Sequence, residues 1–251
     1  MTKPEFFLGM PRNFKDICTI YPPTVADIVK NKDFNLWLAT LELTQEELWD
    51  EFDEIKDSNG NNIQTPTPFE YMLINAYNSG EFENTMKECM QFFIHQEISF
   101  LYDIKAILIG NLEEEITKVN DLKDLKLLTE QDYFDFQNTI RISVGHSIVD
   151  PPEDLSKLDP RIAKFKKKAR ERDKVKAKQE AKNAPSLETI LASICCMGIG
   201  LTPLNIGEIS YAAMSKIMET NQKHEKYDLD CRSMLMGADA KKINYEYWIR
   251  N

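Results

Sequence analysis

The sequence predicts a mainly α protein with a small β element: an α+β N-terminal domain and an all-α C-terminal domain, joined by one long basic helix. Helix-capping patterns, with Ser or Thr three residues before an acidic residue, recur along the chain. Glycine is scarce, at nine of 251 residues, which disfavours a turn-rich all-β fold. Residues 161–184 contain neither Gly nor Pro. We therefore place the N-terminal domain at 1–150, the linker and basic helix at 151–185, and the C-terminal domain at 186–251.

Four helices of the N-terminal domain are expected to begin after a threonine cap. The caps are Thr24, Thr44, Thr67 and Thr129. After the second cap, Leu48, Phe52 and Ile55 recur at the spacing of one helix face. Pro68 at the first helical position strengthens the third start. The fourth helix should end at Gly145, because glycine readily adopts the left-handed backbone that terminates helices.

The β element is expected in the apolar segment EISFLYDIKAILIG, residues 97–110. We interpret Ile98–Ile109 as one or two strands that pair with the segment around Ile63. A buried helix is the alternative, because periodicity does not separate short apolar strands from buried helices. Residues 112–128 predict a short amphipathic helix and a turn.

Charge is distributed very unevenly along the chain. The total is −10, yet residues 161–182 hold eleven Lys or Arg against three acidic residues. This run therefore carries +8, and the other residues together carry −18. Net charge bears on the choice of partners rather than on the fold.

Three interpretations of the basic run stay open. It is a solvated helical spacer, a contact for an acidic partner or for the chain's own acidic domain, or a nucleic-acid contact. Nucleic acid is the least favoured, because Phe165 is the only aromatic residue in the run. The candidate contact residues are Lys164, Lys167, Lys168 and Arg172.

The C-terminal domain should begin with a helix capped by Ser186 and continue with a second capped start at Thr202. Two further helices, 209–222 and 227–236, should be separated by a polar break. Its apolar content is high for so small a domain, so part of it should form a partner face. The candidates for that face are Ile209, Tyr211, Met214, Tyr247 and Trp248.

No motif for catalysis, metal or cofactor binding is present in the sequence. The three histidines are isolated from one another, and the spacing of Gly198 and Gly200 does not fit a phosphate loop. Adjacent Cys195 and Cys196 predict two small core residues, and the odd number of cysteines fits a reducing cytoplasm. We expect no enzyme, no cofactor, no secretory leader and no membrane span.

The order of six segments resembles tail proteins of phages and prophages of Gram-positive bacteria, closest to the tail assembly chaperones. The similarity extends from Ile17 to Asn251. The segments are ICTIYPPTVADIV, TPTPFEYML, DYFDFQNTIR, LDPRIAKFKKKARERDKVKAKQ, SICCMGIGLTPLNIGEISYAAM and MLMGADAKKINYEYWIRN.

The resemblance implies a helical, non-enzymatic protein of the host bacterial cytoplasm that binds the tape measure protein and recruits tail tube subunits. The basic helix would then hold acidic partners or copies of the chain's own acidic domain. The chain departs from the usual pattern in its larger N-terminal domain with a sheet. A structural tail component and a nucleic-acid-associated regulator are the alternatives.

Overall fold

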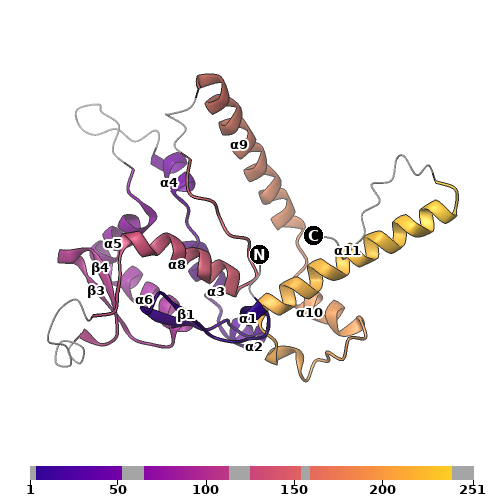
Figure 1. Cartoon of the computed structure of the whole chain (residues 1–251), viewed down its shortest axis with the longest axis horizontal. Helices are drawn as coiled ribbons and strands as arrows, with labels where there is room; N and C mark the ends of the chain where they lie inside the picture. Colours follow the sequence, from indigo (N-terminus) through magenta and orange to yellow (C-terminus); the bar gives the residue numbers. More distant parts are fainter. Residues whose placement is uncertain (1–3, 53–64, 113–124, 154–158, 239–251) are drawn as a thin grey trace.

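A computed structural model describes residues 4–52, 65–112, 125–153 and 159–238. Within them the chain is mainly α, with two small antiparallel sheets (Figure 1). The helices are α1 (Pro4–Phe7), α2 (Val25–Lys30), α3 (Phe34–Leu41), α4 (Gln45–Phe52), α5 (Pro68–Asn78), α6 (Gly80–Ile94), α8 (Glu130–Ser143), α9 (Pro160–Asn183), α10 (Leu187–Cys196) and α11 (Tyr211–Leu235), with 3-10 turns η1 (Tyr102–Ile104) and η4 (Ile206–Glu208). The strands are β1 (Arg12–Phe14), β2 (Cys18–Ile20), β3 (Ile98–Leu101), β4 (Ala106–Ile109) and β5 (Leu127–Leu128).

The predicted strands in residues 98–109 are confirmed, and the helical alternative is excluded. β3 pairs with β4 antiparallel, and β4 pairs in turn with β5. All four residues of β4 are buried, so its continuous apolar run reflects burial on both faces. Leu127 and Leu128 form a strand, not the end of a helix and turn. The expected pairing with Ile63 lies outside the described residues, as does the rest of that predicted helix, 113–124.

Three of the four predicted threonine caps form capping hydrogen bonds, whereas Thr129 occupies the cap position of α8 without a side-chain capping bond. Thr24 and Thr67 each form a reciprocal capping box with the acidic residue three positions later. Thr44 does the same with Glu47, whose carboxylate accepts from the Thr44 backbone N–H at 2.8 Å. Each box satisfies two backbone donors that the first helical turn leaves unpaired.

The main core is built around α6, a helix that sequence reasoning did not identify. Its side chains Met86, Cys89, Met90 and Phe93 are fully buried. They lie between α5, α3, β2 and β3. The helical signal was present, because these residues recur at i, i+3, i+4 and i+7 after the cap Ser79. α3 and the β1–β2 hairpin were also not identified.

The C-terminal segment differs from its prediction in two places. Residues 211–235 form one continuous helix, so the polar break predicted between two helices is wrong. Polar residues do not interrupt a helix when water solvates them and no Gly or Pro intervenes. Thr202 does not open a helix: its backbone N–H donates to Asn205 within a turn that leads to η4.

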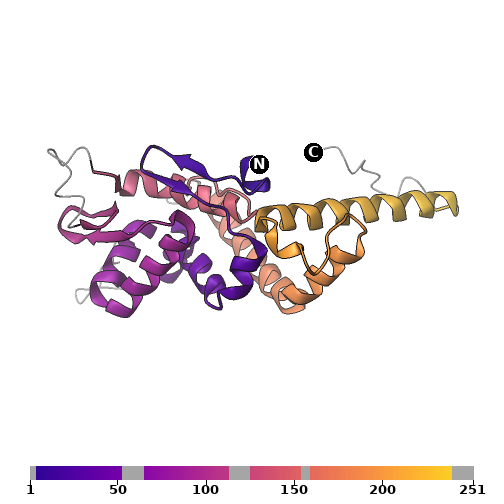
Figure 2. The same ribbon diagram turned by 90° about the horizontal axis from the view of Figure 1, so that it is seen from below.

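The start of α11 packs directly on the N-terminal part of the chain. Its cap Ser210 donates to the carbonyl of Phe7 at 3.0 Å, and the Tyr211 N–H donates to the carbonyl of Pro23 at 2.8 Å. Ala212 belongs to the main core cluster. α9 and the distal part of α11 extend away from this body in different directions (Figures 1 and 2). None of the helices in the described ranges is long and apolar enough to cross a membrane.

Candidate functional site at the root of the basic helix

Ion pairs between described residues hold the basic helix α9 to the acidic part of the chain. Lys166 pairs with Glu153, which precedes the helix, and Arg170 pairs with Glu46 on α4. The Arg170 side chain is 22% exposed, so it is largely covered by this contact. These four residues fix one face of α9 against the body, in agreement with the interpretation that the basic run meets the chain's own acidic domain.

The opposite side of α9 is basic and exposed. Arg161, Lys164, Lys168 and Arg172 all lie open to solvent, and none of them forms an ion pair with another described residue. Their spacing places them within about half a turn of one another, because each residue advances about 100° around a helix. We call these four residues the basic face. It contains three of the four predicted contact residues, and the side chain of the fourth, Lys167, lies outside the description.

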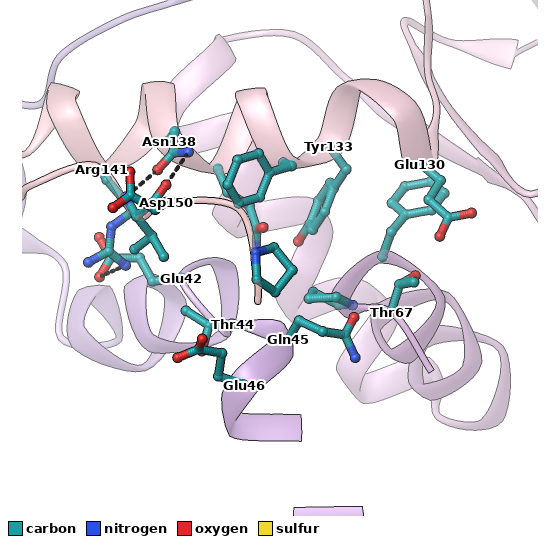
Figure 3. A pocket seen from close by; sticks show the side chains of 16 residues that line it. Glu42, Thr44, Gln45, Glu46, Thr67, Glu130, Tyr133, Asn138, Arg141 and Asp150 are labelled. Carbon is teal, nitrogen blue, oxygen red and sulfur yellow. Dashed lines mark hydrogen bonds and ion pairs between the residues drawn. The ribbon is translucent and has the colours of Figure 1, made fainter. Parts of the chain in front are cut away.

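Beside the root of α9 lies a partly enclosed cavity of about 190 Å³. It is bounded by α8 on one side and by the N-termini of α4 and α5 on the other, with the segment 149–152 along its edge (Figure 3). The cavity exists where it does because Thr44 and Thr67 start two helices at its floor. Glu46, the partner of Arg170, lines it. Glu46 therefore both lines the cavity and binds α9.

The walls of the cavity are mainly apolar and aromatic. Phe69 and Tyr133 are buried and tilted against each other with ring centroids 5.1 Å apart. Phe134, Pro68 and Pro152 complete the apolar lining. Burial raises the pKa of the Tyr133 hydroxyl, which lies 3.6 Å from the sulfur of Met72. The tyrosine is therefore neutral at any physiological pH and acts as a wall rather than as a base.

The edge of the cavity is formed by a strap, residues 147–152, that α8 holds in place. Asn138 donates to the carbonyl of Val149 at 3.1 Å and accepts from its N–H at 2.8 Å. Arg141 donates to the carbonyl of Ser147 at 2.9 Å and pairs with Glu42. Figure 3 shows Asn138, Arg141, Glu42 and Asp150 gathered at this end.

The buried side-chain amide of Gln137 connects α8 to the end of α3 at one side of the cavity. The Gln137 side chain, 7% exposed, donates to the carbonyls of Leu41 and Leu43 at 2.7 and 3.0 Å. These carbonyls lie at the C-terminal end of α3, where the helix leaves acceptors unpaired. Gln137 thereby links α8 to the turn that leads into α4, and this fixes the distance across the cavity.

The mouth of the cavity is acidic. Glu130 and Asp150 are exposed on its rim, and no ion pair within the described ranges neutralises either of them. Glu46 is shared with Arg170, and Arg141 is paired with Glu42. We call Glu46, Glu130 and Asp150 the acidic rim. An apolar interior with an acidic rim suits an apolar group that carries positive charge beside it.

The predicted partner face at the start of α11 is corrected. Met214 is 3% exposed and packs with Val25, Ile194 and Ile206 in a second core cluster. Ile209 and Tyr211 are half-buried against the same cluster, and burial raises the pKa of the Tyr211 hydroxyl. These apolar residues therefore hold α11 to α2 instead of forming an exposed face. Tyr247 and Trp248 lie outside the described residues.

Two further expectations concern the adjacent cysteines and metal binding. Cys195 packs against the second cluster, but Cys196 is exposed, so the prediction of two core cysteines is wrong for Cys196. Neighbours on a helix point about 100° apart, and only one of the two faces the cluster. Among the described residues, no group of three His, Cys, Asp or Glu side chains is placed to hold a metal ion.

The cavity residues were not identified from the sequence. The helix starts at Thr44 and Thr67 are readable, but their meeting with α8 depends on contacts more than sixty residues apart. One usable signal was present: the polar residue Gln137 interrupts the apolar face that Tyr133, Phe136 and Ile140 form on α8. Buried polar side chains are usually hydrogen-bonded to something specific.

Comparisons with models of protein families, with curated proteins and with solved structures find no match to this chain.

Proposed function

We propose that this chain is a non-enzymatic assembly protein that binds other proteins through the basic face of α9. The observation that carries the proposal is the division of α9 into two sides. Lys166 and Arg170 face the body in ion pairs, whereas Arg161, Lys164, Lys168 and Arg172 face solvent. A solvated spacer does not need such a fixed orientation, but a helix that presents charge to a partner does.

The resemblance in segment order specifies the proposal further. Under it, the chain is a tail assembly chaperone of a phage or prophage that binds the tape measure and tail tube proteins in the host cytoplasm. The partner surface that meets α9 is acidic, because the basic face is positive and carries no acidic residue among its four members. The carboxylates of the cavity have no assigned catalytic role in this proposal.

Binding to purified tail proteins tests the proposal. We expect the full chain to retain tail tube or tape measure protein on a column at low salt, and to release it at high salt because surface charges are screened. The double variant Lys164→Glu/Lys168→Glu should lose at least ten-fold in affinity, by reversing two charges in the contact. The matched control is Lys30→Glu/Lys32→Glu, which reverses two exposed charges near α2.

Two results would contradict the proposal. One is equal retention of the tail proteins by the wild type and by Lys164→Glu/Lys168→Glu. The other is retention of random duplex DNA in preference to tail proteins, with a steep dependence on salt, which would favour the nucleic-acid regulator instead.

A further inference from the structure

An exposed aromatic side chain and a cavity of aromatic size lie on different faces of this molecule. Phe165 on α9 is 72% exposed. Arg170, five residues later, points to Glu46 beside the cavity. Five residues separate two side chains by about 140° around a helix. Phe165 therefore points away from the cavity of its own chain for as long as Arg170 holds α9 in place.

The cavity has the size and lining that one aromatic ring requires. A dry protein cavity of about 150 Å³ binds benzene, and this cavity measures about 190 Å³. Sites for drug-sized ligands are larger, roughly 300 Å³ or more. The walls contain Phe69, Tyr133 and Phe134, and an inserted ring can make edge-to-face contacts with such side chains.

The charges around the two features are complementary. Arg161 and Lys168 lie four residues before and three residues after Phe165, so they share its side of the helix. Glu130 and Asp150 on the acidic rim are exposed, and Figure 3 places them at opposite ends of the cavity lining. A ring that enters the cavity from α9 of another molecule would bring two positive charges to two negative ones.

We infer that a second copy of this chain binds at the cavity: its Phe165 enters the cavity, and its Arg161 and Lys168 face Glu130 and Asp150. The inference names one partner of the basic face, and in that respect it rests on the proposed function. Phe165 and the cavity are different patches, so the contact is head-to-tail and not symmetric. Each pair of copies leaves one cavity and one Phe165 unoccupied, and the association continues as concentration rises.

Sedimentation velocity of the full chain tests the association. At low salt the average mass should rise with concentration, and high salt should return it to the monomer. Phe165→Ala should weaken the association at least about ten-fold, because a central aromatic anchor is removed. The matched control Leu229→Ala, which removes a 63% exposed side chain on α11, should leave it unchanged. A wild-type chain that stays monomeric at every concentration overturns the inference.

A mixing experiment tests the direction of the contact. The first variant, Phe165→Ala, keeps an intact cavity, and the second, Glu130→Lys/Asp150→Lys, keeps an intact Phe165. Each alone should be monomeric, and an equimolar mixture should form a dimer and nothing larger, because only one productive contact is left. Dimers that persist in either variant alone overturn the head-to-tail contact.

A second cavity variant keeps the test valid if Glu130→Lys/Asp150→Lys does not fold. Val149→Phe adds a ring to the strap at the cavity edge without changing charge, and should block association as the rim variant does. Circular dichroism should show wild-type helix content for every variant. Association that survives in a folded Val149→Phe chain overturns the cavity as the binding site.

The two proposals fail in distinguishable ways. A monomeric wild type that still retains tail tube or tape measure protein leaves the proposed function standing and removes the self-association. A chain that associates through Phe165 but retains no tail protein removes the proposed function and leaves the self-association standing.

Discussion

α9 and α11 are almost equally long, at 24 and 25 residues, but they are attached to the body in different ways. None of the described side chains of α9 is buried, and the ion pairs Lys166–Glu153 and Arg170–Glu46 connect it to the body. α11 buries Ala212, Ala213 and Met214 in its first turn. Its cap Ser210 donates through the side-chain hydroxyl to Phe7 of α1, and the Tyr211 N–H donates to the carbonyl of Pro23, just before α2. Figure 1 shows that α11 projects away from the body, whereas α9 runs from the top of the view down to α10, beside the start of α11.

The two kinds of attachment should respond differently to salt. Exposed ion pairs contribute little to stability and weaken with salt. Buried apolar contacts are insensitive to salt and cost several kcal/mol when a large side chain is removed. α9 can therefore exchange its own acidic contacts for those of a partner at small cost, whereas α11 is a fixed part of the fold.

The largest effect is expected where α8 meets α11. Gly145 has φ +81°, and a Cβ there would lie 2.9 Å from the Cβ of Ser215 and 3.2 Å from the Cα of Ala212. Gly145→Ala should destabilise the chain by about 3 kcal/mol, the sum of left-handed strain and overpacking. Urea unfolding measures it.

Gly198→Ala is the matched control for that change. Gly198 has φ +69°, but a Cβ there would meet nothing within 4 Å. It should cost only the strain, about 1 kcal/mol. Equal losses in both variants would show that the contact between Gly145 and α11 is not tight.

The buried anchor of α11 gives the next effect. Met214→Ala should destabilise the chain by about 2 kcal/mol, at the low end for such a change because the second cluster is small and can relax. The control on the same helix is Leu229→Ala, whose exposed side chain should matter by less than about 0.5 kcal/mol. If Met214→Ala is as mild as the control in urea unfolding, α11 is not anchored by this cluster.

Removal of the ion pairs of α9 should affect the position of the helix more than global stability. Lys166→Ala/Arg170→Ala should change the free energy of unfolding by less than about 1 kcal/mol. Hydrogen exchange along α9 should nevertheless quicken, as it should for the wild type at high salt. Arg172→Ala, on the outward side, should leave exchange unchanged. Equal exchange in all three proteins would mean that the ion pairs do not hold α9.

Local patterns predicted the ends of elements well, because each depends on a few neighbouring residues. The caps Thr24 and Thr67 and the full length of α9 are examples. The cavity depends on contacts between α4, α5 and α8, such as the amide of Gln137 with Leu41, 96 residues away. Met214 was assigned to a partner face because burial against α2 leaves no trace in the local pattern of α11.

The smallest effect concerns the exposed middle of α11 and its dependence on pH. Glu219 accepts from Lys223 and Lys216 at 2.7 and 2.9 Å, and these contacts lower the pKa of its carboxyl below the usual 4.5. A lowered folded-state pKa stabilises the fold above the unfolded value, and this stabilisation is lost as the pH falls through the folded value. The side chain is 49% exposed, so screening by water limits the effect to a few tenths of a kcal/mol.

Glu219→Gln should therefore destabilise the chain slightly near neutral pH, and this difference should disappear at an acid pH below the lowered folded-state pKa, where the wild-type carboxyl is also protonated. Urea unfolding at the two pH values measures both differences. The control is Glu88→Gln on α6, an exposed carboxylate without an ion pair among the described residues, which should be neutral at either pH. A Glu219→Gln effect that stays constant with pH would show that the loss comes from helix propensity and not from charge. The ion pairs of Glu219 would then add nothing measurable to the stability of α11.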